Sequence, residues 1–281
     1  MQQNHLMIDS LSGFLQRHPR MFILSGAGVS TASGIPDYRD EQGRWKRSPP
    51  VDGRAFVESE AVRRLYWARS MIGWTTVARA RPNPAHAALA RLQAAARVHR
   101  LVTQNVDGLH QRAGSQDVIE LHGSISHVIC IDCGVRIERS GVQQWLQGAN
   151  PTRAREVATV APDGDADLDQ VDFDGFQIPA CSHCGGILKP DVVFFGDVVP
   201  RDRVAAAMEA LEQADAMLVV GSSLMLYSGY RFCEGARKMG KPIAAVNLGR
   251  TRADHLFELK IERPCAEALM ELMTALALPR T

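Results

Sequence analysis

A short apolar run followed at once by glycines is the feature that most limits what this chain can fold into. Residues 21–24 have the length and composition of a buried strand, and Ser25-Gly26-Ala27-Gly28 follows them directly. Glycines at a strand end let the backbone approach a pyrophosphate, whose charge is stabilised by the N-terminus of a following helix. The G-x-G-x-x-G fingerprint is incomplete, because Thr31 stands in its third glycine position. Alone, the segment fits either a dinucleotide site or a tight strand-to-helix turn.

The loop after these glycines favours the dinucleotide interpretation. Residues 34–39 read Gly-Ile-Pro-Asp-Tyr-Arg, so a proline-stiffened loop carries an acid, an aromatic ring and an arginine. A loop of this composition, directly after a phosphate-binding turn, could reach over a cofactor.

Predicted strands and helices alternate along most of the chain. We expect strands at 21–24, 98–103, 118–121, 192–195, 216–220 and 242–246, and helices at 5–17, 58–79, 84–96, 204–213, 230–239 and 267–276. Residues 125–188 lack this periodicity. The alternation predicts an α/β fold built on an open, mostly parallel sheet covered by helices. With 281 residues, 46% of them hydrophobic, the chain can bury one large core, with or without a smaller lobe.

Four of the predicted strands end in polar or glycine-rich turns, at residues 25–28, 104–105, 221–223 and 247–249. Ligands of open parallel sheets bind outside the carboxyl ends of the strands. Four such turns along one edge indicate an elongated polar ligand, and a dinucleotide fits that description. The alternative is that these glycines and asparagines only serve ordinary turn geometry.

Two C-x-x-C pairs, Cys130/Cys133 and Cys181/Cys184, predict a structural zinc site. Four thiolates complete a tetrahedral zinc site and leave no open position for a substrate. The gap between the pairs exceeds the usual spacing, so an insertion must loop out between them. Buried or redox-active cysteines are the alternative. Cys233 lies outside the pattern, and we expect it to be packed in the core.

Composition excludes several classes of function. The net charge of +1 provides no basic field for nucleic acid or an anionic membrane surface. No apolar stretch approaches the roughly 20 residues of a membrane span, and the first residues match neither a secretory signal nor a transit peptide. Four cysteines in metal-type spacing indicate a reducing compartment. We therefore expect a cytoplasmic protein, or a mitochondrial matrix protein if the source is eukaryotic.

Taken together, several strings resemble the sirtuin family along nearly the whole chain: GAGVSTASGIPDYR, TQNVDGLH, ELHGS, the paired C-x-x-C, KPDVVFFGD, VVGSSL and VNLG. YWAR, RPNPAH and YSGYRF look most like its class II branch. The resemblance implies a Rossmann-type large domain at 1–44, 97–124 and 189–281. It also implies a small helical and zinc-binding lobe at 45–96 and 125–188. The activity implied is NAD-dependent removal of an acyl group from protein lysine, with transfer of that group to ADP-ribose and release of nicotinamide.

The matching motifs carry the family's NAD-binding roles onto residues of this chain. The phosphate turn and the loop over the nicotinamide ribose would comprise Gly26, Ala27, Gly28, Thr31, Asp37, Tyr38 and Arg39. The ribose and carboxamide would be held by Gln104, Asn105 and Asp107. The phosphates and the adenosine end would be held by Gly221, Ser222, Ser223, Asn247, Leu248, Gly249 and Cys265. Tyr38 stands where many members have phenylalanine, and Asp40 where serine is usual.

His122 is the candidate general base, with Asn105 as the second catalytic residue. An imidazole titrates near neutrality, so it can take a proton from a ribose hydroxyl that then attacks the acyl-derived centre. A histidine at a strand end is by itself more often structural, and the ELHGS match assigns it the catalytic role.

The acyl substrate is expected to lie as an extended strand between Val193-Phe194-Phe195-Gly196 and residues 224–229. Tyr66 and Arg69 are spaced to share one helical face, and a similar pair binds a carboxylate in sirtuins that prefer acidic acyl groups. The alternative is an exposed helix arginine beside a packed tyrosine. Our hypothesis is that acidic or longer acyl groups compete well with acetyl.

Other activities fit parts of the pattern. A mono-ADP-ribosyltransferase would also release nicotinamide, and a lipoamidase or acid-acyl deacylase would be the main activity if the acyl pocket favours those groups. A hydride-transfer dehydrogenase shares the strand-end turns. A zinc-ribbon binding module or a non-catalytic NAD sensor fits least, given an intact His122 and Asn105. The expected partners are acylated-lysine proteins, without nucleic acid or membrane, and we expect a monomer.

Overall fold

The computed structural model describes residues 2–46, 50–153, 173 and 175–278. Its largest element is a six-stranded sheet with the strand order β3-β2-β1-β7-β8-β9, in which all neighbouring strands are parallel. The strands are β1 (Met21–Ser25), β2 (Val98–Thr103), β3 (Ile119–Glu120), β7 (Ala216–Val220), β8 (Ile243–Val246) and β9 (Leu259–Ile261). This strand order is that of the Rossmann fold, so the predicted fold class is confirmed.

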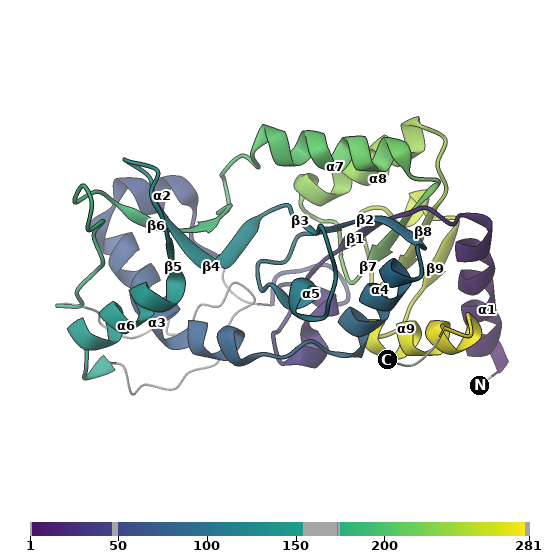
Figure 1. Ribbon diagram of the computed structural model, residues 1–281, viewed down its shortest axis with the longest axis horizontal. Helices are drawn as coiled ribbons and strands as arrows, with labels where there is room; N and C mark the ends of the chain where they lie inside the picture. The colour runs from purple at the N-terminus through teal and green to yellow at the C-terminus, as the bar shows by residue number, and fades with distance from the viewer. Residues whose placement is uncertain (1, 47–49, 154–172, 174, 279–281) are drawn as a thin grey trace.

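Helices cover both faces of this sheet (Figure 1). One face carries α7 (Arg201–Gln213) and α8 (Tyr227–Lys238), and the other carries α1 (Gln2–Arg17), α4 (Pro84–Ala94) and α9 (Cys265–Ala275). Each strand serves both layers, because its side chains alternate between the faces. Met21 and Ile23 of β1 pack in the α1/α4/α9 layer, whereas Phe22 and Leu24 pack in the α7/α8 layer.

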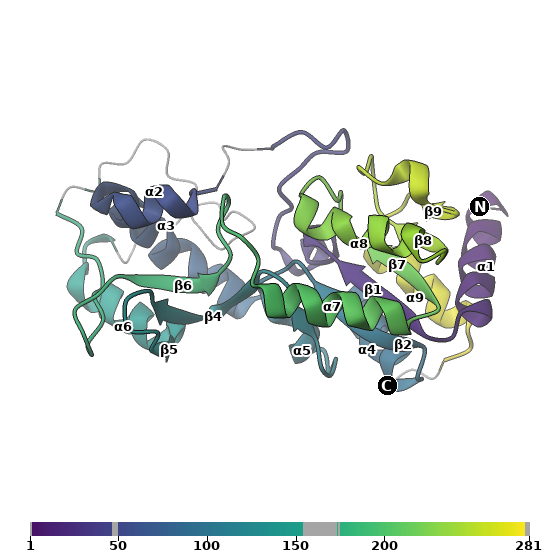
Figure 2. The ribbon, with the colours of Figure 1, turned by 90° about the horizontal axis from the view of Figure 1, so that it is seen from above.

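A smaller lobe lies beside the large sheet (Figure 2). It contains an antiparallel sheet in the order β5-β4-β6, formed by β4 (Gly123–Cys130), β5 (Arg136–Glu138) and β6 (Leu188–Val192). The helices of this lobe are α2 (Gly53–Glu58), α3 (Glu60–Arg79) and α6 (Arg139–Ala149). The remaining short helix, α5 (Leu109–Arg112), lies in the large domain. Phe56, Trp67, Val128 and Leu146 belong to the hydrophobic core of the small lobe.

One predicted strand differs from the structure, and one strand of the large sheet was not predicted. The strand expected at 192–195 is instead β6, which ends at Val192 and pairs antiparallel with β4. The apolar residues after it form a loop, because Phe194 packs sideways into the core of the small lobe. The short strand β9 was not predicted, since its three residues carry no clear apolar period.

The division into two parts also differs in detail from our expectation. Helix α4, expected in the small lobe, packs against α9 and contributes Ala85 and Leu89 to the core of the large domain. Strand β6 belongs to the small sheet rather than the large one. We therefore propose that the lobe boundaries fall before Pro84 and after Val192. Residues 154–172 of the expected insertion lie outside the described part of the chain.

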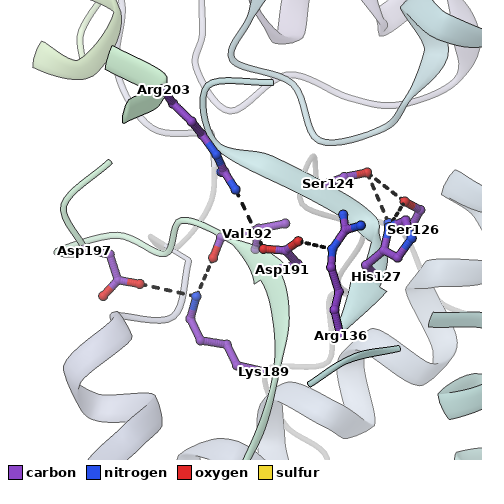
Figure 3. Close-up of polar contacts among 9 residues, drawn as sticks. All are labelled: Ser124, Ser126, His127, Arg136, Lys189, Asp191, Val192, Asp197 and Arg203. Atoms are coloured by element: carbon purple, nitrogen blue, oxygen red, sulfur yellow. Dashed lines mark hydrogen bonds and ion pairs between the residues drawn. The ribbon is translucent and has the colours of Figure 1, made fainter. Parts of the chain in front are cut away.

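Charged residues connect the small sheet to α7 of the large domain (Figure 3). Asp191 of β6 accepts a hydrogen bond from Arg136 Nε of β5 at 2.7 Å and lies 3.9 Å from Arg203 of α7. Lys189 donates to the carbonyl of Val192 and lies 3.4 Å from an Asp197 oxygen.

In the described part of the chain, no helix has the length and apolar character needed to cross a membrane.

Candidate active site

A cavity of about 840 Å³ is lined by both lobes. All but one of the predicted NAD-binding residues line it. They are Gly26, Ala27, Gly28, Thr31, Asp37, Tyr38, Arg39, Gln104, Asn105, Asp107, Gly221, Ser222, Ser223, Asn247, Leu248 and Cys265. The predicted general base His122 and five of the six predicted substrate residues, Tyr66, Val193, Phe194, Phe195 and Gly196, line it too. Gly249 and Arg69 are not among the lining residues.

The glycine turn after β1 presses against the turn after β7. The amide of Gly28 donates to the carbonyl of Gly221 at 2.8 Å. A Cβ atom on Gly26 would lie 2.8 Å from the Cβ of Ser222, and one on Gly221 would lie 2.4 Å from the amide nitrogen of Val29. Only glycines allow this approach. The turn continues into the short 3₁₀ helices η1 (Ala27–Val29) and η2 (Thr31–Ser33).

Side chains after β2 form a polar network on the cavity wall. Gln104 donates to Ser222 Oγ at 2.8 Å, which ties the end of β2 to the end of β7. Asn105 Nδ2 donates to Ser30 Oγ at 3.0 Å, and Ser30 in turn donates to Asp107 Oδ2 at 2.7 Å. Ser30 therefore fixes the orientation of two predicted NAD-binding side chains.

Two fully buried histidines, His86 and His110, lie behind this network with their ring centroids 4.8 Å apart. His110 Nε2 lies 2.8 Å from Ser25 Oγ, and His86 Nε2 lies 3.5 Å from Ser30 Oγ. Burial lowers the pKa of His86 to about 4 and that of His110 to about 3. Both rings are therefore neutral at pH 7, and they support the network without adding charge.

His122 reaches the cavity from the turn between β3 and β4. Its Nδ1 lies 2.9 Å from the carbonyl oxygen of Gln104. A carbonyl only accepts, so Nδ1 carries the proton and Nε2 is the basic nitrogen. Nε2 lies 2.9 Å from Ser228 Oγ at the start of α8. Burial lowers the pKa of His122 to about 4, with a smaller opposing contribution from the Gln104 carbonyl. The ring is neutral at pH 7 and can accept a proton.

An aromatic cluster supports the loop that carries Asp37, Tyr38 and Arg39. The rings of Tyr38 and Trp45 meet edge to face at 6.1 Å, and each also contacts Phe195, at 6.1 and 5.4 Å respectively. The Arg39 guanidinium lies 4.0 Å from the Trp45 ring centroid and donates to the carbonyl of Gly43 at 2.8 Å. Tyr38 thereby links the predicted NAD loop to the predicted substrate loop.

The substrate loop at 193–196 is held by backbone hydrogen bonds. The amide of Val193 donates to the carbonyl of His122 at 2.8 Å, and Gly53 donates to the carbonyl of Phe195 at 2.8 Å. The Phe194 ring packs against Tyr66 at 5.2 Å between centroids. Tyr66 is 4% exposed, so it closes an apolar end of the cavity. Arg69 is half-buried in the same helix.

The turn after β8 contributes Asn247 and Leu248 to the cavity wall. Asn247 Nδ2 donates to the carbonyls of Leu248 and Gly249, at 3.0 and 3.2 Å, so this side chain shapes its own turn. The thiol of Cys265 lies 3.6 Å from the carbonyl of Val246. Gly249 supports the turn from outside, because a Cβ there would lie 2.5 Å from the Cα of Glu41.

The four cysteines of the C-x-x-C pairs come together in the small lobe. Their sulfur atoms all lie within 4.8 Å of one another. Cys130 and Cys184 are 3.6 Å apart, and Cys133 and Cys181 are 3.8 Å apart. In a tetrahedral site with Zn–S bonds of about 2.3 Å, the sulfurs lie about 3.8 Å apart. The cluster therefore fits a zinc ion, and it lies apart from the cavity, as a structural site should. Cys233 is buried in the core, as predicted.

Comparison with known proteins decides the family. The Sir2 family model matches residues 26–228. The chain belongs to the Sir2 family. Named relatives are similar along nearly their whole length. An NAD-dependent protein deacetylase of Bordetella bronchiseptica is 58% identical over 95% of this chain and 97% of its own. One from Xanthomonas campestris is 57% identical over 92% of this chain and 89% of its own.

Solved Sir2 structures share the architecture. A Sir2 complex with a p53 peptide and NAD⁺ superimposes with a TM-score of 0.80 at 28% identity, covering 96% of this chain and 98% of that chain. A Sir2 bound to an acetylated peptide gives a TM-score of 0.79 at 28% identity, with the same shares covered. The predicted sirtuin resemblance is thus confirmed.

Ser30, Trp45 and Arg231 line the cavity but were not singled out from the sequence, and Ser228 was predicted only as part of the 224–229 loop. Ser30 lies between two glycine-rich stretches, and its role is visible only once Asn105 and Asp107 meet it. Ser228 lies within the string YSGYRF, which carried the branch resemblance without a role for any single residue. The individual contacts with NAD and substrate stay predictions.

Proposed function

We propose that this Sir2-family protein removes acyl groups from protein lysines with NAD as co-substrate. The observation that carries the proposal is a neutral His122 whose basic nitrogen faces the same cavity as the two glycine turns. The overall reaction consumes acyl-lysine, NAD and water, and it yields lysine, nicotinamide and O-acyl-ADP-ribose. The named relatives are NAD-dependent protein deacetylases, which supports the same reaction.

The residues present fit NAD. The Gly26 and Gly221 turns both line the cavity and pack so closely that a Cβ on either glycine would clash with the other turn, which is the close approach that glycines allow in a dinucleotide-binding turn. When bound, NAD supplies the ribose carbon that loses nicotinamide and the hydroxyl that takes over the acyl group. Asn105 and Asp107, fixed through Ser30, would orient the nicotinamide end.

His122 would accept the ribose hydroxyl proton at Nε2. The Gln104 carbonyl holds the proton on Nδ1, so Nε2 is the basic nitrogen; it accepts from Ser228 Oγ in this structure and would accept from the ribose hydroxyl in its place when NAD is bound. The new charge would be shared with this carbonyl, which favours the imidazolium. The aromatic cluster of Tyr38, Trp45 and Phe195 would shield the reacting carbon from water.

The acylated lysine would enter between the 193–196 loop and residues 224–229, with its acyl end toward Phe194 and Tyr66. That Tyr66 and Arg69 select acidic acyl groups stays a prediction. Tyr66 lines the cavity, whereas Arg69 is not among the lining residues. Turnover of acetyl, glutaryl and lipoyl peptides by the protein and by Arg69→Ala would test this prediction. An unchanged ranking in Arg69→Ala would remove Arg69 from acyl selection.

We also propose a monomer that acts in the cytoplasm, where thiolates stay reduced for zinc. Mono-ADP-ribosyl transfer is the second candidate activity, because it uses the same nicotinamide-releasing step. Mass spectrometry of the protein target separates the two activities. Deacylation leaves a free lysine and a modified ADP-ribose, whereas transfer leaves ADP-ribose on the target.

A further inference from the structure

Two arginines and two tyrosines contact one another near the start of α8, and two of the four, Tyr227 and Arg231, line the cavity. The Arg231 guanidinium carbon lies 5.1 Å from the Tyr227 ring centroid. The Arg252 carbon lies 4.3 Å from the Tyr230 ring centroid and 5.9 Å from that of Tyr227. We call these four residues the arginine–tyrosine stack. Cation–π contacts hold the guanidinium groups in place but leave their charges unneutralised.

Neither arginine of the stack has an acidic partner among the residues that the structure describes. Arg231 Nε is buried and makes no hydrogen bond. Arg252 Nη1 donates only a long bond of 3.4 Å to the carbonyl of Met225. Arg263, which also lines the cavity, does have an acidic partner, because its Nη1 lies 2.7 Å from Glu271 Oε2. The stack therefore places two positive charges beside the cavity, a half-buried one at Arg231 and an exposed one at Arg252.

The stack lies beside the predicted path of the substrate peptide. Arg231 and Tyr227 line the cavity, and so does Ser228, which contacts His122. Arg231 comes three residues after Ser228 in α8, so the two lie on one face of the helix. Arg231 is also among the charges that hold down the pKa of His122, which agrees with a position near the catalytic ring.

We propose that the arginine–tyrosine stack binds the carboxylate of an aspartate or glutamate that flanks the acylated lysine. The inference rests on the deacylase function proposed above and adds a preference for acidic substrate sequences. A guanidinium matches a carboxylate with two parallel hydrogen bonds, and the Tyr227 ring, whose centroid lies 5.1 Å from the Arg231 guanidinium carbon, limits the movement of this group. The source is a flanking side chain rather than the acyl tail, because the stack is at an open rim, with Tyr227 53% exposed. The acyl end lies toward Tyr66, which is 4% exposed.

Matched acetyl-lysine peptides provide the test. One set carries glutamate at single positions on either side of the acetyl-lysine, and the matched set carries glutamine there. We expect kcat/KM to favour at least one glutamate peptide by about tenfold, the value of one charged hydrogen-bonded contact. The preference should shrink as salt rises, since the rim is open to solvent. A second arm compares glutaryl-lysine with a neutral acyl-lysine of equal length in the glutamine background.

Arg231→Gln should abolish the glutamate preference, and Arg252→Gln should weaken it. Arg237→Gln is the matched control, because Arg237 is exposed in the same helix and does not line the cavity. Unfolding temperature and NAD affinity check that each variant is folded. If Arg231→Gln fails that check, Arg252→Gln and the peptide series still decide the question.

Several results would overturn the proposal. One is equal turnover of glutamate and glutamine peptides by the unmodified protein, and another is a preference that survives in both variants. A third is an effect of Arg231→Gln on the glutaryl arm alone, which would assign the arginine to the acyl tail. If the protein turns over the glutamine peptides and the glutamate peptides at the same rate, only this inference is wrong. If the protein turns over no acylated peptide, the proposed function itself is wrong.

Discussion

The Nε2 atom of His122 lies 2.9 Å from the hydroxyl oxygen of Ser228, while Nδ1 of the same ring lies 2.9 Å from the carbonyl of Gln104. The carbonyl fixes the proton on Nδ1, so the Ser228 hydroxyl donates to Nε2. A hydroxyl can also rotate and accept. Ser228 can therefore contact the ring both before and after Nε2 takes a proton.

Removing this hydroxyl should slow catalysis more than it weakens NAD binding. We expect Ser228→Ala to lower kcat by about tenfold, because one hydrogen bond to a charged group is lost. The Kd for NAD should change little. Ser228→Thr should restore most of the rate, since it keeps the hydroxyl. Rates and Kd values are measured by nicotinamide release and by calorimetry. A threonine variant as slow as the alanine variant would contradict the role of the hydroxyl.

The pKa of His122 predicts an unusual acid limit for activity. Burial lowers this pKa from about 6.5 to about 4, so the neutral base persists well below pH 6. The acid limb of kcat/KM should therefore have its midpoint near pH 4 and not near 6.5. The pH profile is measured by nicotinamide release over the range in which the protein stays folded. A loss of activity centred near pH 6.5 would contradict a neutral, desolvated His122.

The buried pair His86 and His110 should make folding acid-sensitive. Their pKa values are lowered to about 4 and about 3 in the folded protein, so the unfolded chain binds more protons below pH 6.5. The free energy of unfolding should fall as the pH drops from 6.5 toward 4, by an amount on the order of a few kcal/mol. Urea titrations at a series of pH values measure this slope.

The matched variants for this test are His110→Gln and His255→Gln. Glutamine can still donate to Ser25 but cannot become charged, so the slope should flatten in His110→Gln. His255 is exposed, and its replacement should leave the slope unchanged. The same slope in both variants would show that the buried pair does not set the acid sensitivity.

Loss of zinc should unfold the small lobe before the large domain. The small sheet is only three strands, and the four cysteines come together in the same lobe, so metal binding contributes about 10 kcal/mol or more to its order. Cys184→Ser or a strong chelator should expose amides of β4–β6 to hydrogen exchange while β1 and β7 stay protected. Cys233→Ala is the control, because Cys233 lies in the large core. Equal protection of β4–β6 with and without metal would contradict a structural zinc site.

A methyl group at Gly26, where the turn after β1 meets the turn after β7, should impair NAD binding. The Cβ of Gly26→Ala would lie 2.8 Å from Ser222 Cβ and 2.9 Å from the Gly221 carbonyl, so the two turns must separate. We expect the Kd for NAD to rise by at least about tenfold, since amide positions shift. Gly141→Ala is the control, because nothing lies within 4 Å of its added Cβ and it is exposed in α6. Calorimetry with NAD measures both, and an unchanged Kd in Gly26→Ala would contradict a role for this close approach.

The large domain could be predicted from the sequence because its signals are local. Strands β1, β2, β7 and β8 coincide with predicted strands that are followed by polar turns, and parallel pairing brings those turns to one edge. The small lobe could not be predicted in this way. Its order comes from the Cys130–Cys184 cluster and from long-range packing of α3 on α6, which leave no period in residues 125–188.

The same distinction explains what was missed in the site. Residues inside uncommon strings, such as Asn105 and His122, were found because the string carries their role. Ser30, Ser228 and Arg231 act through partners more than 70 residues away in the chain. Their side chains are common residues in ordinary contexts, so only the folded geometry identifies them. The prediction of a strand at 192–195 was wrong. The apolar side chain of Phe194 is buried against Tyr66, so it explains the apolar run although the residues after Val192 do not pair in a sheet.

The most direct test of the account is product analysis after the protein is incubated with NAD and an acetyl-lysine peptide. The account predicts that mass spectrometry finds nicotinamide, the free-lysine peptide and O-acetyl-ADP-ribose in equal amounts, and that His122→Ala yields no free-lysine peptide although it stays folded. Free-lysine peptide formed without NAD, or formed at an undiminished rate by His122→Ala, would contradict it.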